Sequence, residues 1–154
     1  MEEKFMRRAI ELAKENVKRG GGPFGAVIVK DGEVVAESGN SVTLDNDPTA
    51  HAEVNAIRRA AAKLQDFNLE GCEIYASCEP CPMCLGAIYW AHISKIYYCC
   101  TRDDAAAAGF DDEAIYREFA TPPSQRKIPT LRLSMPEGEE VFKLWEQSTA
   151  AKRY

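Results

Sequence analysis

Two short stretches decide the fold of this chain: DPTAHAE at residues 47–53 and SCEPCPMC at residues 77–84. The first ends with an imidazole and a carboxylate two residues apart, and the second ends with two thiols three residues apart. Thiolates and imidazoles are the ligands that zinc prefers, and a catalytic site keeps one of the four positions open for water. The two stretches therefore predict a catalytic zinc centre, and the remaining chain is expected to form its scaffold and its pocket.

The spacing within each stretch places the metal ligands at the starts of helices. Cys81 and Cys84 can face one ion from a helix N-terminus, where the helix dipole also stabilises thiolates. His51 and Glu53 would diverge on a regular helix, so they converge only at a helix start, and Asp47-Pro48 is typical of an N-cap followed by a first helical residue. We predict that His51, Cys81 and Cys84 bind zinc and that Glu53 carries protons beside it.

Two other interpretations of the cysteine pair stay open at this point. A Cys-x-x-Cys pair also occurs in structural zinc sites and in redox-active pairs. Cys78 could supply the additional ligand of a structural site, although it lies close to the expected strand exit. Cys72, Cys99 and Cys100 lie beside or inside apolar runs and are interpreted as small core residues.

The composition is that of a soluble globular protein. The 154 residues fit one domain, residues 1–154, with an apolar share of 45% and a charged share of 28%. No apolar run is long enough for a membrane span and the N-terminus lacks signal-peptide features, so no membrane partner and a cytoplasmic location are expected. A net charge of −5 without a dense basic block argues against a nucleic-acid partner.

Hydrophobic periodicity and turn residues predict alternating helices and strands. Helices are expected at residues 2–19, 48–64, 82–92, 103–108, 113–119 and 139–152, and strands at residues 24–30, 33–38, 72–77, 95–100 and 128–134. Asp31-Gly32 predicts a two-residue hairpin turn. This order implies an α/β fold with a mainly parallel sheet covered on both faces, in which the first hairpin is the antiparallel part.

The two opening stretches also resemble a known family. His-Ala-Glu followed by Pro-Cys-Pro-Met-Cys is similar to the signature of the zinc-dependent cytidine deaminase superfamily. A closer likeness, to bacterial guanine deaminases of this fold, is carried by GPFGAVIV at residues 22–29, SCEPCPMCLGAIYWA at residues 77–91, AGFDD at residues 108–112 and a final helix ending in Tyr154. The likeness covers essentially the whole chain and implies a three-layer α/β/α sandwich with a five-stranded mixed sheet.

The resemblance implies a reaction and a set of site residues. The reaction is hydrolytic deamination of guanine, a small purine, to xanthine and ammonia by a zinc-activated water, with Glu53 as proton shuttle and one Zn²⁺ per subunit. The implied substrate contacts are Asn40, Ala52 through its backbone N–H, Phe24, Asp112, Tyr154 and Trp90. The alternatives are the same chemistry on guanosine, cytosine or tRNA adenosine, and a zinc-stabilised binding module without turnover.

The resemblance also implies a homodimer in which a C-terminal segment, about residues 121–154, is exchanged between subunits. Pro122-Pro123 is the stiffest linker of the chain and suits the hinge of such an exchange. Tyr154 of one subunit would then close the pocket of the other. Composition alone gives plainer roles to Asn40 as a turn residue, to Asp112 as a helix N-cap and to Tyr154 as a frayed terminus.

Overall fold

The computed structural model describes residues 2–154, which divide into two compact units, one that ends at Asp112 and one from Glu113 to Tyr154. Among the described residues, no helix combines the length and the apolar character that crossing a bilayer requires.

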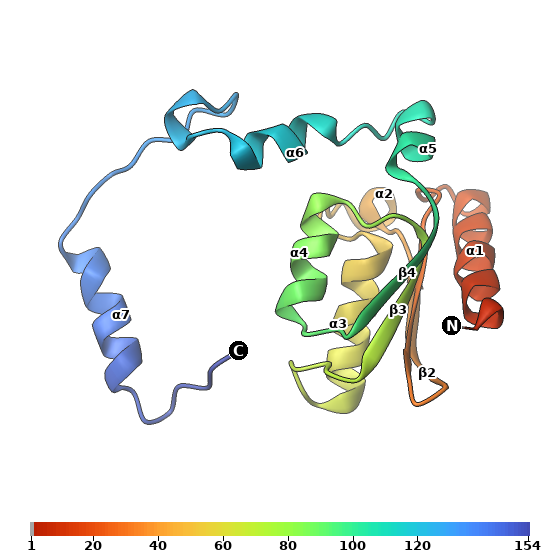
Figure 1. Ribbon diagram of the computed structural model, residues 1–154, viewed down its shortest axis with the longest axis horizontal. Coiled ribbons are helices and arrows are strands. Elements are labelled where there is room, and N and C mark those ends of the chain that lie inside the picture. The colour runs from red at the N-terminus through yellow and green to blue at the C-terminus, as the bar shows by residue number, and fades with distance from the viewer. Residues whose placement is uncertain (1) are drawn as a thin grey trace. The chain divides into compact units, whose positions relative to one another are not determined.

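The first unit contains all the strands of the described chain (Figure 1). Its helices are α1 (Glu3–Lys18), α2 (Val42–Asp45), α3 (Ala52–Leu64), α4 (Pro82–Trp90) and α5 (Arg102–Ala107). Its strands are β1 (Gly25–Lys30), β2 (Glu33–Gly39), β3 (Cys72–Cys78) and β4 (Lys95–Cys100). The predicted hairpin between β1 and β2 is confirmed, with Asp31 and Gly32 both at positive φ, as a type I′ turn requires.

The strands form one sheet in the order β2-β1-β3-β4. β1 is antiparallel to both of its neighbours, β2 and β3, and β3 is parallel to β4. β2, β3 and β4 therefore run in the same direction. The expectation of mainly parallel pairing is wrong, because β1 lies between β2 and β3 and runs against both.

Helices cover the sheet on both faces, which confirms the predicted α/β/α layers (Figure 1). On one face α1 packs through Phe5, Ala9 and Leu12 against residues of β1 and β3. On the other face α3 and α4 enclose an apolar cluster with the sheet residues Ile28 and Ile74. The core of the first unit is therefore split into two layers by its own sheet.

The prediction of a five-stranded sheet is wrong for the described residues, because the sheet has four strands. Residues 128–134, the expected fifth strand, form no regular element. A strand is defined by hydrogen bonds to a neighbouring strand, and the second unit contains no strand with which this segment could pair. Pro129 removes one further donor from it.

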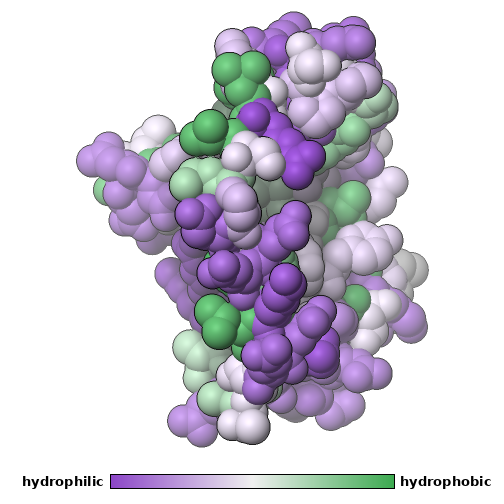
Figure 2. Space-filling view, turned by 90° about the vertical axis from the view of Figure 1, so that its left-hand side faces the viewer, coloured by the Kyte–Doolittle hydropathy of each residue, from purple (hydrophilic) through white to green (hydrophobic). Residues whose placement is uncertain are grey.

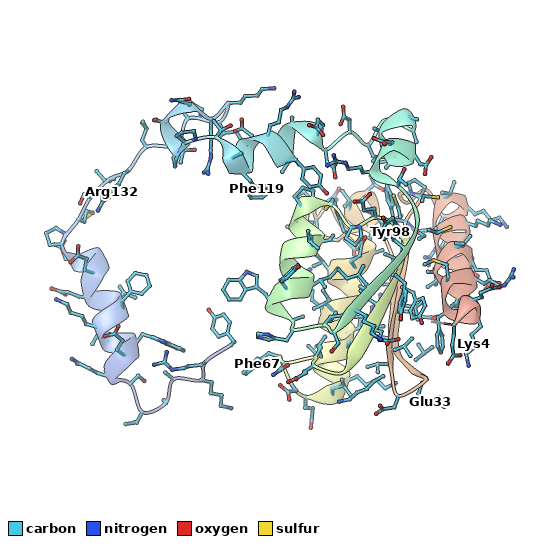
Figure 3. The ribbon with its side chains drawn as sticks, viewed as in Figure 1. Lys4, Glu33, Phe67, Tyr98, Phe119 and Arg132 are labelled. Atoms are coloured by element: carbon cyan, nitrogen blue, oxygen red, sulfur yellow. The ribbon has the colours of Figure 1, made fainter. Side chains whose placement is uncertain are left out.

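The second unit contains the helices α6 (Glu113–Ala120) and α7 (Glu137–Gln147) and the short 3-10 helix η1 (Pro123–Gln125). None of the three has a buried residue. In Figure 3 the side chain of Phe119 projects away from α6, and Figure 2 shows hydrophobic side chains standing among hydrophilic ones on the surface. The expected final helix at residues 139–152 is too long, because α7 ends at Gln147 and Tyr154 is not helical.

Candidate metal centre

The candidate metal centre forms where α3 and α4 begin. His51 is the N-cap of α3, with φ −67° and ψ 155°, and Cys81 is the N-cap of α4, with φ −65° and ψ 169°. Pro82 occupies the first helical position of α4, where its fixed φ suits the helix and its missing N–H costs nothing. Both ligand-bearing segments are therefore extended at the ligand residue and helical directly after it.

The start of α3 differs from the predicted one. Asp47 does not cap the helix, because its Oδ1 accepts hydrogen bonds from the backbone N–H of Thr49 at 2.8 Å and from the Thr49 hydroxyl at 2.7 Å. Asp47 and Pro48 thus form a turn, and α3 begins four residues later than expected, at Ala52. The shift places His51 at the helix boundary, which is the condition for His51 and Glu53 to converge on one point.

The three predicted ligands lie together. Nδ1 of His51 is 3.5 Å from Sγ of Cys81 and 3.5 Å from Sγ of Cys84, and the three ligand atoms all lie within 4.8 Å of one another. Tetrahedral bonds of about 2.0 Å to nitrogen and about 2.3 Å to sulfur would separate these atoms by about 3.6 Å. The donor types and their spacing both fit zinc.

The protonation of the two thiols is coupled. The contact between the thiols of Cys81 and Cys84 lowers the pKa of Cys81, and the same contact, followed by burial, raises the pKa of Cys84. The hydrogen bond with Cys81 raises the pKa of His51. A metal ion competes with these protons, because it binds thiolates and neutral imidazole, so metal binding at this centre releases protons.

Glu53 lies at the second position of α3 and is buried, with 6% of its surface exposed. Its Oε2 accepts a hydrogen bond of 3.4 Å from Sγ of Cys84, but Glu53 is not part of the three-residue ligand cluster. Burial raises the pKa of its carboxyl group. A buried carboxyl group that touches the metal ligands can accept and return a proton there.

Cys78 does not complete a structural four-ligand site. Its thiol donates instead to the backbone oxygen of Thr101 at 3.4 Å, and burial raises its pKa to about 11. Within residues 2–154 the ligand cluster contains only His51, Cys81 and Cys84. The structure therefore favours the open, three-ligand arrangement of a catalytic zinc site.

Two of the expected substrate contacts, Asn40 and Phe24, lie at neighbouring strand ends. The backbone N–H of Asn40 donates to the carbonyl oxygen of Phe24 at 3.1 Å. Oδ1 of Asn40 accepts a hydrogen bond of 3.1 Å from the backbone N–H of Val42, and the residue is buried. The Phe24 ring packs edge-on against Phe110 with centroids 5.0 Å apart. Both side chains are thus held by their own surroundings before any ligand binds.

The other expected contacts are placed differently. Ala52 is fully buried at the first position of α3. Asp112 is half-buried, and its pKa is raised mainly by burial and further by the negative charge of Cys81. Trp90 is 66% exposed at the far end of α4, roughly 13 Å along the helix axis from Cys81. Tyr154 belongs to the second unit.

Sequence reasoning missed two asparagines, Asn16 and Asn55, that hold the backbone around Asn40. Asn16 falls on the apolar face of α1, seven residues after Ala9. An amide side chain at such a position is the signal that could have found it, because a buried polar group requires hydrogen-bond partners. Asn55 sits on the half-buried side of α3 and gives no comparable signal.

Comparisons with known proteins show a family and several relatives that this chain resembles. The family described as the cytidine and deoxycytidylate deaminase zinc-binding region matches residues 1–100. The guanine deaminase of Bacillus subtilis (strain 168) is 52% identical over 153 residues, which are 99% of this chain and 98% of that protein. A tRNA-specific adenosine deaminase of Aquifex aeolicus is 44% identical over 96 residues, covering 62% of this chain and 64% of that protein.

A solved structure gives the same result for the fold. The X-ray structure of guanine deaminase from Bacillus subtilis matches with a TM-score of 0.97 at 51% sequence identity, covering 100% of this chain and 99% of that chain. The likeness therefore extends through both units.

Proposed function

Because the chain belongs to the cytidine and deoxycytidylate deaminase zinc-binding family, we propose that it hydrolyses guanine to xanthine and ammonia. The observation that carries this proposal is the extent of the likeness to the Bacillus subtilis guanine deaminase, which covers 99% of the chain. The tRNA-specific relative covers 62% of it. The net charge of −5 also disfavours a polyanionic substrate such as tRNA.

The chemistry is hydrolytic, and Glu53 carries its protons. Zinc held by His51, Cys81 and Cys84 would supply Lewis-acid activation of a water molecule, whose pKa falls from about 16 toward about 7 on such an ion. Glu53 takes one proton from the water as the water adds to C2 of guanine, and delivers this proton to the ring nitrogen. It then takes the remaining proton of the added hydroxyl and passes it to the amine, so that the C2–N bond breaks, C2=O forms and ammonia leaves. Burial raises the pKa of Glu53, which favours the uptake of a proton by this carboxyl group.

The purine would be recognised by polar groups around this carboxyl group. Asn40 and the backbone N–H of Ala52 are assigned to the base edge, since the first N–H groups of a helix have no intrahelical partner. Asp112 would accept hydrogen bonds from ring N–H donors, and Phe24 would pack on the ring face. A base with a different donor pattern would leave these groups unpaired, which lowers kcat/KM for that base by several powers of ten.

The second unit is proposed to pack against a partner subunit. Its apolar side chains have no core within the unit to enter; they include Ile115, Phe119, Ile128, Leu131, Leu133, Val141, Phe142 and Leu144. In the first unit β4 pairs only with β3, and Tyr98 on β4, labelled in Figure 3, is 50% exposed. Residues 121–154 of one copy would cover this edge of a second copy and bring Tyr154 to its pocket. Deleting Arg153 and Tyr154 should then reduce turnover without loss of zinc.

The proposed function is tested with the full-length, zinc-loaded chain and a panel of guanine, guanosine, cytosine and adenosine. Ammonia release should be fastest with guanine and should stop after chelation. Turnover of another member of the panel in preference to guanine would assign the same chemistry to a different substrate. Loss of secondary structure together with the metal would instead identify a structural zinc site. A cytoplasmic location stays a prediction from the sequence.

A further inference from the structure

Two asparagines, one on each face of the sheet, donate hydrogen bonds to the backbone of Asn40 and of its neighbour Gly39. We propose that Asn16 of α1 and Asn55 of α3 are positioning residues that fix the Asn40 side chain for purine binding. They would act on substrate affinity through Asn40 without touching the purine. This inference rests on the proposed function, because it takes Asn40 as a substrate contact.

Asn16 holds residue 40 itself. It is 1% exposed, and its Nδ2 donates hydrogen bonds to the carbonyl oxygens of Asn40 at 2.6 Å and Gly22 at 2.7 Å. Its Oδ1 accepts a hydrogen bond of 3.1 Å from Nη2 of Arg19. Both amide protons and the amide oxygen are thus used, and the side chain joins the end of β2 to the loop that precedes Phe24.

The backbone at Gly21 and Gly39 lies close against the Asn16 amide. A Cβ atom on Gly21 would collide with Nδ2 of Asn16, and one on Gly39 would lie 2.6 Å from its Oδ1. Real side chains do not approach so closely, so glycine at both positions lets the backbone close around the amide. The carbonyl oxygen of Asn40 therefore has one well-defined position relative to α1.

Asn55 holds the residues on either side of Asn40. Its Nδ2 donates to Oγ of Ser41 at 2.9 Å, to the carbonyl oxygen of Gly39 at 3.2 Å and to that of Ala50 at 3.3 Å. It lies one turn after His51, and its own backbone N–H donates to the His51 carbonyl oxygen at 2.9 Å. Asn55 thus connects residues 39–41 to α3, the helix that follows the ligand residue His51.

Three sets of hydrogen bonds together restrain the Asn40 amide. Its carbonyl oxygen is fixed to α1, its chain neighbours are fixed to α3, and its Oδ1 accepts from Val42. With Oδ1 engaged in this way, Nδ2 is the group left to donate to a ligand. A displacement of about 1 Å in a binding group can cost roughly a hundredfold in rate.

A purely structural role makes a different prediction, so the experiment is a double-mutant cycle. Asn16→Ala and Asn55→Ala are each made alone and together with Asn40→Ala, and Asn68→Ala is the control, because Oδ1 of Asn68 serves only the exposed turn to Glu70. KM for guanine should rise about tenfold in each positioning variant, with a smaller change in kcat and full zinc content. Neither substitution should raise KM further once Asn40 is alanine.

Additive effects on KM in the Asn40→Ala background would overturn the proposal, and so would an unchanged KM in both single variants. If Asn16→Ala does not fold, Asn55→Ala decides, because Asn55 is only half-buried. Hydrogen exchange of the Val42 amide, which donates to Asn40, should accelerate in the positioning variants but not in Asn68→Ala. That measurement needs no substrate. A wild-type chain that does not deaminate guanine would therefore refute the proposed function. An unchanged rate of Val42 amide exchange in the positioning variants would instead refute the positioning role.

Discussion

The two units of this chain use apolar residues in opposite ways. In residues 1–112 they fill two layers on either side of a four-stranded sheet, and Ile28, Ile74 and Val27 are almost fully buried. In residues 113–154 the helices have amphipathic sequences but no buried residue. The difference shows that the first unit has the core a stable domain needs, whereas α6 and α7 do not bury their apolar faces, although such packing is what mainly stabilises an amphipathic helix.

The largest expected effect tests whether the chemistry resides in the first unit. Glu53→Gln should lower kcat for guanine by about a thousandfold, because the amide cannot carry the proton. Zinc content should stay at one per chain, since Glu53 is not a ligand. Glu70→Gln, at an exposed position, is the matched control. Full activity in Glu53→Gln would remove Glu53 from the mechanism.

A second pair of substitutions compares the cores directly. Ile74→Ala, in the buried sheet, should lower the free energy of unfolding by about 2–5 kcal/mol at every protein concentration. Leu133→Ala, which is 86% exposed in the second unit, should change it by less than about 0.5 kcal/mol in dilute solution. Under the proposed exchange it should weaken self-association instead, which urea unfolding and sedimentation can separate. Equal losses independent of concentration would mean that the second unit has a core within its own chain.

The smallest expected effect concerns an ion pair that ties α1 to β2. Nη2 of Arg8 lies 2.7 Å from Oε1 of Glu37, and this hydrogen bond lowers the pKa of Glu37. A lowered carboxyl pKa adds stability above the unfolded-state pKa of about 4.3, and that stability is lost as the pH falls through the folded-state value. Because both side chains are about one-third exposed, Glu37→Gln should cost only about 0.5 kcal/mol at pH 7. Thermal unfolding should show the difference from wild type vanishing in acid, and a constant difference would contradict this explanation.

Much of the first unit could be predicted from local patterns. Asp31-Gly32 predicted the hairpin, and the spacing of Cys81 and Cys84 predicted the start of α4. Both predictions succeeded because a turn and a helix start depend mainly on neighbouring residues. The start of α3 was predicted wrongly. Asp47 could cap a helix or close a turn with Thr49, and both uses satisfy the same carboxylate.

The fifth strand could not be decided from the sequence for a different reason. Residues 128–134 have a strand-like composition, but a strand exists only when a second one supplies hydrogen-bond partners. Asn16 and Asn55 were missed because their acceptors, the carbonyl oxygens of Asn40 and Gly39, are remote in sequence.

The sequence by itself predicted the donor atoms of the metal centre, the carboxyl group beside them and, apart from the short helix α2, the order of helices and strands in the first unit. These follow from ligand chemistry and from the periodicity of short segments, which are properties of neighbouring residues. Only the tertiary structure decided that β1 runs against β3 and that Cys78 bonds to Thr101 instead of joining the ligands. It also decided that Asn16 bonds to the backbone of Asn40, and Asn55 to that of Gly39. Each of these depends on contacts between distant segments, because buried polar groups take whichever partners the packed fold brings to them.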